Sequence, residues 1–361
     1  MPRGQCSDHP RWHICLPHFP ARHQRKQKSQ IERPKRYSMD PQAEEYFNLG
    51  LVKLMSGHFN DAITNFDIVI ELLPGAESAY YNRAKAKYPL GDLAGALKDF
   101  TSAINLNPSD ADIYYNRGVV RAEMKDNIGA ISDYSRAIEL NPTLVDAYYN
   151  RGNEKLALKA YQESILDFDN AIQFGTNDPN VIFNRGFAKM MIKEYGEAIN
   201  DFSLIINLDK TYQKAYTERG SAKHRLGDLE GAIADFDLAI KIDPSIPINY
   251  YNRALTKQIA KDFEGAIIDY SKAIHRDDSY SKAFCNRGVC KRSVGDYSGA
   301  IADYDRAISL APWETNSYYN RAIAKESENN YHGAIQTTIQ LSTYIQNMPR
   351  HTATEASSKS N

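Results

Sequence analysis

Thiol and imidazole groups, the side chains best suited to metal chemistry, lie close together near the N-terminus of the chain. Zn²⁺ prefers such ligands. The donors there are Cys6, His9, His13, Cys15 and His18. Several prolines interrupt the segment, and it has no helix or hairpin pattern that would hold the ligands in a tetrahedral arrangement. We therefore predict that the chain holds no metal and no cofactor.

The other cysteines and histidines do not form a catalytic group. Cys285 and Cys290 lie five residues apart, a spacing that points them to different faces of a helix. Four histidines fall in different repeats and at different repeat positions: His58, His224, His275 and His332. The chain also lacks a phosphate-binding glycine loop, a nucleophile elbow and a paired His-Glu zinc motif. These observations predict a protein that is not an enzyme.

One asparagine recurs at intervals of 34 residues or a multiple of 34. This asparagine row consists of Asn48, Asn82, Asn116, Asn150, Asn184, Asn252, Asn286 and Asn320, and Glu218 interrupts it. Bulky residues precede it, among them Tyr81, Tyr115, Tyr149, Tyr251 and Tyr319. Because amides both donate and accept hydrogen bonds, the row predicts contact with the backbone of an extended peptide, and the rings offer apolar area. The alternative interpretation is that the asparagines help neighbouring helices to pack.

Charged residues repeat at the same period. An arginine follows each position of the asparagine row from residue 82 onward, in an arginine row that includes Arg83, Arg117, Arg151, Arg185, Arg219, Arg253, Arg287 and Arg321. A basic residue lies four positions later. The carboxylate row recurs further along each repeat as Asp99, Asp133, Asp167, Asp201, Asp235, Asp269 and Asp303. The two rows predict a structural ladder of Arg-Asp pairs. Pairing within a repeat and pairing between repeats fit the spacing equally well.

The formal net charge of −1 is the sum of two opposed parts. Residues 1–38 carry +7 and the rest of the chain carries −8. The basic segment lacks hydrophobic periodicity, so we predict a disordered arm, with a nucleic-acid or nuclear-import patch as the alternative. Met39 is an alternative start of the protein. Residues 349–361 are predicted to form a polar, disordered tail.

The 34-residue period also predicts the helices that carry these rows. Nine repeats tile the chain without insertion: 43–76, 77–110, 111–144, 145–178, 179–212, 213–246, 247–280, 281–314 and 315–348. In the third repeat, apolar residues at helical spacing predict helices over residues 113–125 and 128–140. Gly91-Asp92 and Gly227-Asp228 suit a tight turn between two such helices, since glycine ends the first and aspartate caps the second. Each repeat is thus predicted to be a helical hairpin that buries its apolar side against its neighbours.

This pattern resembles the tetratricopeptide repeat (TPR) family, whose 34-residue unit has an aromatic residue and then Gly or Ala in the first helix, and Ala, aromatic, Ala in the second. The resemblance implies an all-α solenoid over residues 39–348, wound as a right-handed superhelix, with first helices lining a concave groove. Departures include Pro89 in the second repeat and Thr338 at the aromatic position of the last repeat. The polar residues around Thr338 predict that the last helix is a terminal cap with a polar outer face.

The function that we predict is a non-catalytic protein-protein interaction scaffold that holds an extended peptide of a partner protein in the groove. The alternative is a helical-repeat RNA-binding protein aided by the basic arm, which we disfavour because the repeats are net negative. No apolar run is long enough to span a membrane. With only four cysteines in 361 residues, the chain is expected to be cytoplasmic.

Overall fold

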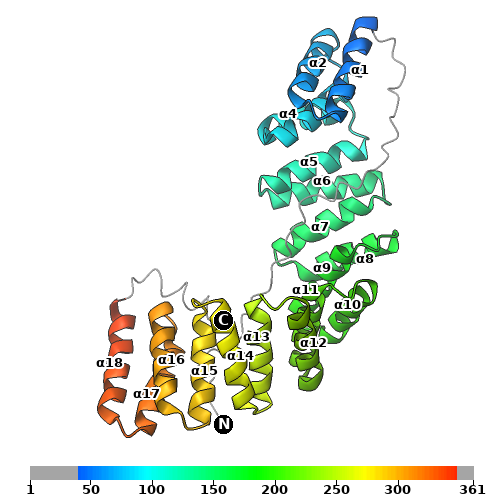
Figure 1. Ribbon diagram of the computed structural model, residues 1–361. Helices are drawn as coiled ribbons and strands as arrows, with labels where there is room; N and C mark the ends of the chain where they lie inside the picture. The colour runs from blue at the N-terminus through cyan, green and yellow to red at the C-terminus, as the bar shows by residue number, and fades with distance from the viewer. Residues whose placement is uncertain (1–39, 348–361) are drawn as a thin grey trace. The chain divides into compact units, whose positions relative to one another are not determined.

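The computed structural model describes residues 40–347, and within this range the chain folds into α-helices without β-strands (Figure 1). The helices are α1 (Pro41–Met55), α2 (Phe59–Leu72), α3 (Glu77–Lys87), α4 (Leu93–Leu106), α5 (Ala111–Glu123), α6 (Asn127–Leu140), α7 (Val145–Ala157), α8 (Tyr161–Gln173), α9 (Pro179–Met191), α10 (Tyr195–Leu208), α11 (Gln213–Leu226), α12 (Leu229–Ile242), α13 (Pro247–Ile259), α14 (Phe263–Arg276), α15 (Ser281–Ser293), α16 (Tyr297–Leu310), α17 (Thr315–Ser327) and α18 (Tyr331–Asn347). The expected all-α architecture of paired helices is confirmed. The predicted basic arm, its cysteines and histidines, and the predicted polar tail lie outside the described residues.

The described helices belong to two compact units. The N-terminal unit contains α1–α9 in residues 40–194, and the C-terminal unit contains α10–α18 in residues 195–347. The boundary falls between the two helices of the fifth repeat, α9 and α10. None of the described helices is long and apolar enough to cross a membrane.

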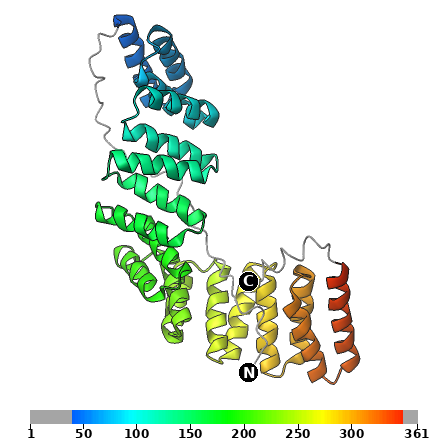
Figure 2. The ribbon, with the colours of Figure 1, turned by 180° about the vertical axis from the view of Figure 1, so that it is seen from behind.

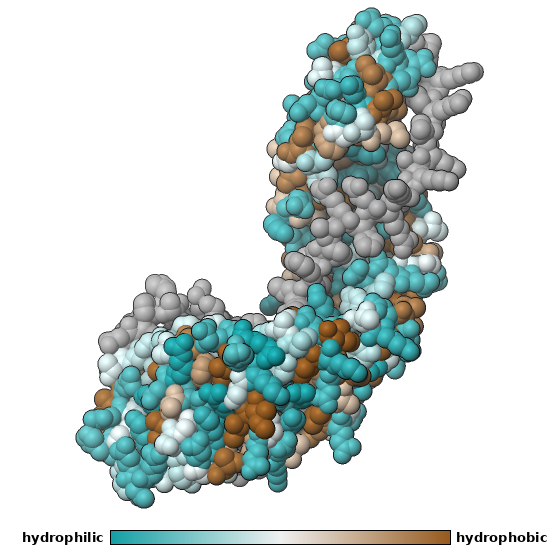
Figure 3. Space-filling model, in the orientation of Figure 1, coloured by the Kyte–Doolittle hydropathy of each residue, from teal (hydrophilic) through white to brown (hydrophobic). Residues whose placement is uncertain are grey.

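Within each unit, the two helices of a repeat pack against each other, and the second helix of each repeat also packs against the first helix of the next (Figures 1 and 2). The core between them combines large aromatic rings with small residues. The ring of Tyr134 on α6 is fully buried against Gly118 on α5, where a Cβ atom would approach Tyr134 Cε1 to 2.8 Å. Glycine at this position therefore allows the two helices to approach closely. Hydrophilic side chains cover most of the surface visible in Figure 3, and hydrophobic ones form small separate groups.

Successive first helices also contact one another. These contacts join α1 to α3 and α5 to α7 in the N-terminal unit, and α11 to α13 and α13 to α15 in the C-terminal unit. They are more extensive than any contact between successive second helices among the described residues. Each unit therefore has a first-helix face, on which the odd-numbered helices lie side by side.

The turn inside every repeat contains one residue in the left-handed region of φ, and these residues are also spaced by 34. Glycine occupies the position at Gly57, Gly91, Gly227 and Gly295, with φ between 78° and 87°. The other repeats place a side chain there, with φ between 61° and 68°, at Lys125, Lys159, Lys193, Lys261 and Asn329. The helix predicted over 113–125 consequently ends at Glu123, because Lys125 has left the helical conformation.

Aspartates cap the second helices α4, α6, α12, α14 and α16, and the Asp126 side chain accepts a hydrogen bond from Gly129 N at 2.9 Å. The second repeat differs at Pro89, where α3 ends at Lys87 and a 3₁₀ turn over Tyr88–Leu90 leads into Gly91. A proline cannot donate the backbone hydrogen bond that would continue the helix, so the turn begins earlier there.

Replacing Lys125 with Gly is expected to raise the free energy of unfolding by about 1 kcal/mol, because the left-handed conformation is strained for lysine and free of strain for glycine. Urea denaturation followed by circular dichroism measures the gain. Lys125→Ala is the matched control, since alanine loses the same side chain but keeps the strain. An equal gain in both variants would show that removal of the lysine side chain, and not the backbone conformation, causes the effect.

Candidate functional site

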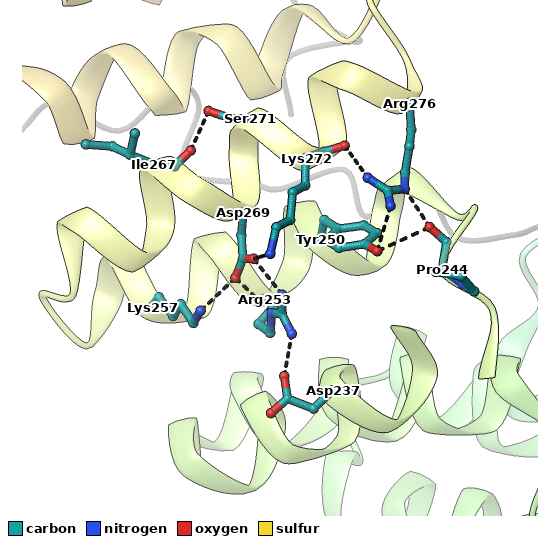
Figure 4. A network of polar contacts seen from close by, with 10 residues as sticks. All are labelled: Asp237, Pro244, Tyr250, Arg253, Lys257, Ile267, Asp269, Ser271, Lys272 and Arg276. Atoms are coloured by element: carbon teal, nitrogen blue, oxygen red, sulfur yellow. Dashed lines mark hydrogen bonds and ion pairs between the residues drawn. The ribbon is translucent and has the colours of Figure 1, made fainter. Parts of the chain in front are cut away.

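The arginine row links two repeats at once, as the close-up of Arg253 shows (Figure 4). On α13, Arg253 donates from Nε and Nη2 to the two carboxylate oxygens of Asp269 on α14, at 2.8 and 2.5 Å. Lys257 Nζ donates to the same carboxylate at 2.8 Å. The third guanidinium nitrogen, Nη1, donates to Asp237 in the preceding repeat at 2.5 Å. Asp269 is buried, with 1% of its side chain exposed, whereas 55% of Asp237 is exposed.

The same geometry recurs along the array. Each buried carboxylate lies sixteen residues after its arginine, in the same repeat, in the pairs Arg83–Asp99, Arg117–Asp133, Arg151–Asp167, Arg219–Asp235 and Arg287–Asp303. These contacts decide between the two pairings that the spacing left open, in favour of pairing within a repeat. Of the remaining members of the two rows, Arg185 on α9 and Asp201 on α10 belong to different units. Arg321 on α17 has Thr337, not a carboxylate, sixteen residues later.

A second row of acceptors lies sixteen residues before each arginine, in the preceding repeat, and was not predicted from the sequence. Its members accept a hydrogen bond from Nη1 and are Asp67, Thr101, Ser135, Asp169, Ser203, Asp237, Ser271 and Asp305. The residue type changes from repeat to repeat, so no single letter recurs at the period. A search for any hydroxyl or carboxylate at this spacing would have found the row.

Except for Arg185, which follows Ile182, each arginine also lies over the aromatic ring three residues earlier. Arg253 Cζ is 5.7 Å from the centre of the Tyr250 ring, and Arg287 Cζ is 5.4 Å from that of Phe284. The ring and the two acceptors together leave 13% of the Arg253 side chain exposed. The guanidinium groups thus serve the packing of the repeats and have little surface left for a phosphate.

Members of the asparagine row connect successive first helices. Asn116 Nδ2 donates to Tyr81 Oη at 3.1 Å, and Asn150 Nδ2 donates to Tyr115 Oη at the same distance. In the C-terminal unit, Asn286 Nδ2 donates to Tyr251 Oη at 3.0 Å. Each bond joins an asparagine to the tyrosine that belongs to the previous repeat. The row therefore contributes to contacts between repeats.

The exposure of the asparagine row varies along the chain. Five members are buried: Asn82, Asn184, Asn252, Asn286 and Asn320. Asn48 is exposed, while Asn116 and Asn150 are half-buried. Asn116 Nδ2 also donates to the Asp112 carbonyl at 2.7 Å, so both of its N–H groups are used and only Oδ1 is left to accept a hydrogen bond. Among the described residues, Asn116 and Asn150 are thus the partly exposed asparagines that have other members of the row on both sides.

The tyrosines that precede the row also differ between units. Tyr81, Tyr115 and Tyr149 in the N-terminal unit are half-buried, whereas Tyr251 is buried and 54% of Tyr319 is exposed. Burial raises the pKa of Tyr81 well above its usual value, and the nearby carboxylates Asp112, Asp110 and Glu77 raise it further. Asp146 has the same effect on the pKa of Tyr115, where burial is again the main cause. Tyr81 and Tyr115 thus lie near carboxylates, and Lys85 Nζ lies 5.1 Å from the centre of the Tyr81 ring.

Glu218 takes the place of asparagine on α11 and is buried, with 6% exposed. Desolvation raises the pKa of its carboxyl to about 7, from an ordinary value of 4.5. On the same helix, Thr217 Oγ1 donates to Asn249 Oδ1 on α13 at 2.7 Å, and the His224 ring contacts Thr256 Oγ1 at 2.9 Å. Hydroxyls and a histidine thus replace the tyrosine-asparagine contact between α11 and α13.

Comparisons with known proteins agree with this architecture. Profiles described as TPR repeat match residues 85–125 and 122–156. Profiles described as tetratricopeptide repeat match residues 213–246 and 281–313. No curated protein is a significant match to the chain by sequence.

Among solved structures, the C-terminal part of a TPR repeat-containing protein from Cytophaga hutchinsonii has a TM-score of 0.57 at 20% identity, covering 66% of this chain and 97% of that chain. A tetratricopeptide repeat protein from Parabacteroides merdae has a TM-score of 0.49 at 21% identity, covering 70% and 97%. YrrB, described as a TPR protein with an unusual peptide-binding site, has a TM-score of 0.47 at 24% identity, covering 51% and 95%. At these identities the likeness concerns the fold.

Repeat length, helix pairing and profile matches agree with one another, and arrays of this kind are in general interaction scaffolds without catalytic activity. The chain thus contains tetratricopeptide repeats, which the profiles match over residues 85–156, 213–246 and 281–313.

Proposed function

We propose that the chain is a non-catalytic scaffold that binds an extended peptide of a partner protein along the first-helix face of the N-terminal unit. The observation that carries this proposal is the half-buried set of tyrosines and asparagines on α3, α5 and α7. The hydrogen bonds Asn116–Tyr81 and Asn150–Tyr115 hold these side chains in place before any partner arrives. A preorganised surface loses less conformational entropy on binding.

The chemistry of this set favours a peptide that donates hydrogen bonds. Oδ1 of Asn116 and of Asn150 can each accept from a backbone N–H of an extended chain, and the tyrosine rings offer apolar area. The carboxylates Asp110, Asp112 and Asp146 lie near these rings. Residues 40–194 carry a net charge of −7, against −2 for residues 195–347. We therefore infer a basic peptide as the partner segment.

The C-terminal unit provides a matched comparison within the same chain. Asn286 bonds Tyr251 in the same way, but 3% of Asn286 and 2% of Tyr251 are exposed. A peptide cannot reach these buried side chains without moving the helices. We therefore expect this pair to hold repeats together and to contribute nothing to peptide binding.

The proposal is tested with basic peptides selected from a random display library against the full chain. We expect the double variant Asn116→Ala/Asn150→Ala to weaken binding of a selected peptide about tenfold or more, since two hydrogen bonds of about 1 kcal/mol each are lost. Fluorescence anisotropy with a labelled peptide measures the affinity. Affinity is also expected to fall as salt is added, because the attraction is partly electrostatic.

Asn286→Ala is the control, because it removes an equivalent tyrosine contact from a buried position. Thermal denaturation of all variants separates binding from stability. If the double variant and the control lose stability but bind the peptide as the wild type does, the asparagines act only in packing and the proposal fails. The RNA-binding alternative gains no support, because the carboxylates that pair with the arginines reduce the positive field a polyanion would require.

A further inference from the structure

The last helix of the C-terminal unit, α18, has an unusual outer face. No Asp, Glu, Lys or Arg occurs from Tyr331 to Asn347. Large apolar side chains are exposed along it: Tyr331 (58%), Ile335 (60%), Ile339 (58%) and Ile345 (53%). Their spacing places them on one side of the helix, together with Thr338 and Ser342. The polar cap that the sequence predicted thus carries an uncharged, largely apolar stripe.

The equivalent positions of the inner repeats explain why this stripe is exposed. Ile301 and Ile267 correspond to Ile335, and both are half-buried and packed within core clusters. In Figures 1 and 2, α18 lies at the end of the C-terminal unit beside α17. Ile335 therefore keeps the residue type of a packed position, while 60% of its surface is exposed.

A further repeat of the same kind would not fit this face. Ile339 takes the position of Asp305 and Ser271, which accept a hydrogen bond from the arginine of the following repeat. An isoleucine cannot accept that bond, so Nη1 of the arginine in another repeat would lose its acceptor there, while a carboxylate within that repeat could still pair with the rest of the guanidinium. An apolar, uncharged surface matches the exposed isoleucines of α18 better.

We propose that α18 is a self-association surface and that two copies of the chain pack α18 against α18 in antiparallel orientation about a two-fold axis. A second α18 brings the same uncharged stripe, whereas a charged partner would find no group to pair with. With the axis near Thr338, Tyr331 of one copy lies near Ile345 of the other, and Ile335 and Ile339 of both copies meet at the centre. Residues 348–361 are not suited to cover the stripe, because Met348 is their one large apolar residue.

The contact of one helix face with another lies below the size of a standard stable interface, so the dimer should form in a concentration-dependent equilibrium. Depletion of charge at the centre of the contact is typical of interface cores. This surface lies in the C-terminal unit and is independent of the peptide-binding site proposed in the N-terminal unit.

Sedimentation equilibrium of the full chain over a series of concentrations tests the proposal. We expect the wild type to dimerise, and the double variant Ile335→Glu/Ile339→Glu to raise the dissociation constant at least about tenfold, because four carboxylates would meet at the contact. The control is Ile268→Glu on α14, where 56% of an isoleucine is exposed outside the stripe. This control should dimerise as the wild type does. Circular dichroism shows whether each variant is folded.

A charge exchange identifies the partner surface. Mixing Ile335→Glu/Ile339→Glu with Ile335→Lys/Ile339→Lys should give a heterodimer, although each variant alone is monomeric, because only an α18–α18 contact brings the two charges together. A monomeric wild type at every concentration overturns the proposal. Growth into open-ended oligomers overturns it as well, since that result indicates a head-to-tail contact between α18 and another surface.

Discussion

Replacing Asp269 with Ala is expected to lower the free energy of unfolding by about 3 kcal/mol or more. The change leaves Arg253 and Lys257 without the buried carboxylate that both contact, at 2.5 to 2.8 Å. Only 13% of the Arg253 side chain and 22% of the Lys257 side chain are exposed, so water cannot fully replace the lost partner. Urea denaturation gives the total change, and hydrogen exchange of α13 and α14 should show that the loss is centred on the seventh repeat.

Asp237→Ala is the matched control because Asp237 contacts the same guanidinium from the preceding repeat. Since 55% of this carboxylate is exposed, its loss should change stability by no more than about 1 kcal/mol. The comparison holds the arginine constant, while Asp269 is the more buried partner and also accepts from Lys257. Equal effects of the two variants would contradict the conclusion that the pair within the repeat carries most of the stabilisation.

Replacing Glu218 with Gln is expected to stabilise the protein above neutral pH by about 3 kcal/mol. Burial raises the pKa of this carboxyl from 4.5 to about 7 in the folded state. The folded state therefore favours the protonated form, and the stability that this form provides is complete below pH 4.5, declines as pH rises, and is lost above about pH 7. Gln keeps the shape of protonated Glu and carries no charge at any pH.

The stability difference between Glu218→Gln and the wild type should therefore be small near pH 4.5 and reach its full size above pH 7. Urea denaturation across this range measures it. The pKa of His224 is lowered to about 4, first by burial and then by Arg225, and this second titration cancels because both proteins contain it. Glu230→Gln, at an exposed position on α12, is the control for the loss of one carboxylate. A constant difference at all pH values would mean that the pKa of Glu218 is the same in the folded and unfolded states.

The fold could be predicted from the sequence because the same packing requirement recurs in every 34-residue repeat. A helical hairpin of 34 residues must place small residues against large rings, as Gly118 and Tyr134 do, and this need fixes residue types at fixed positions. The turn was harder to recognise. Lys125 and Lys261 adopt the left-handed conformation that glycine adopts elsewhere, because the packed helices on either side fix the chain direction.

The candidate site was less predictable than the fold, because the hydrogen-bond partners and the burial of a side chain depend on its neighbours in three dimensions. The spacing of Arg253 and Asp269 showed that they recur together, but only the structure shows that both lie in one repeat and that Asp237 completes the contact from the repeat before. Burial likewise separates Asn116 from Asn286, although both occupy the same repeat position. The residues that cover a side chain come from neighbouring helices, which a pattern of single letters does not describe.

The contacts that an arginine makes in its own repeat and in the preceding repeat determine how the protein can gain or lose repeats. The buried carboxylate lies sixteen residues after its arginine in the same repeat, so a duplicated or deleted repeat takes its own neutralising charge with it. The contact across the joint accepts Asp, Ser or Thr, as Asp237, Ser271 and Thr101 show, so a newly adjacent repeat needs no compensating substitution. Gain or loss of whole repeats by recombination can therefore proceed without leaving a buried arginine unpaired.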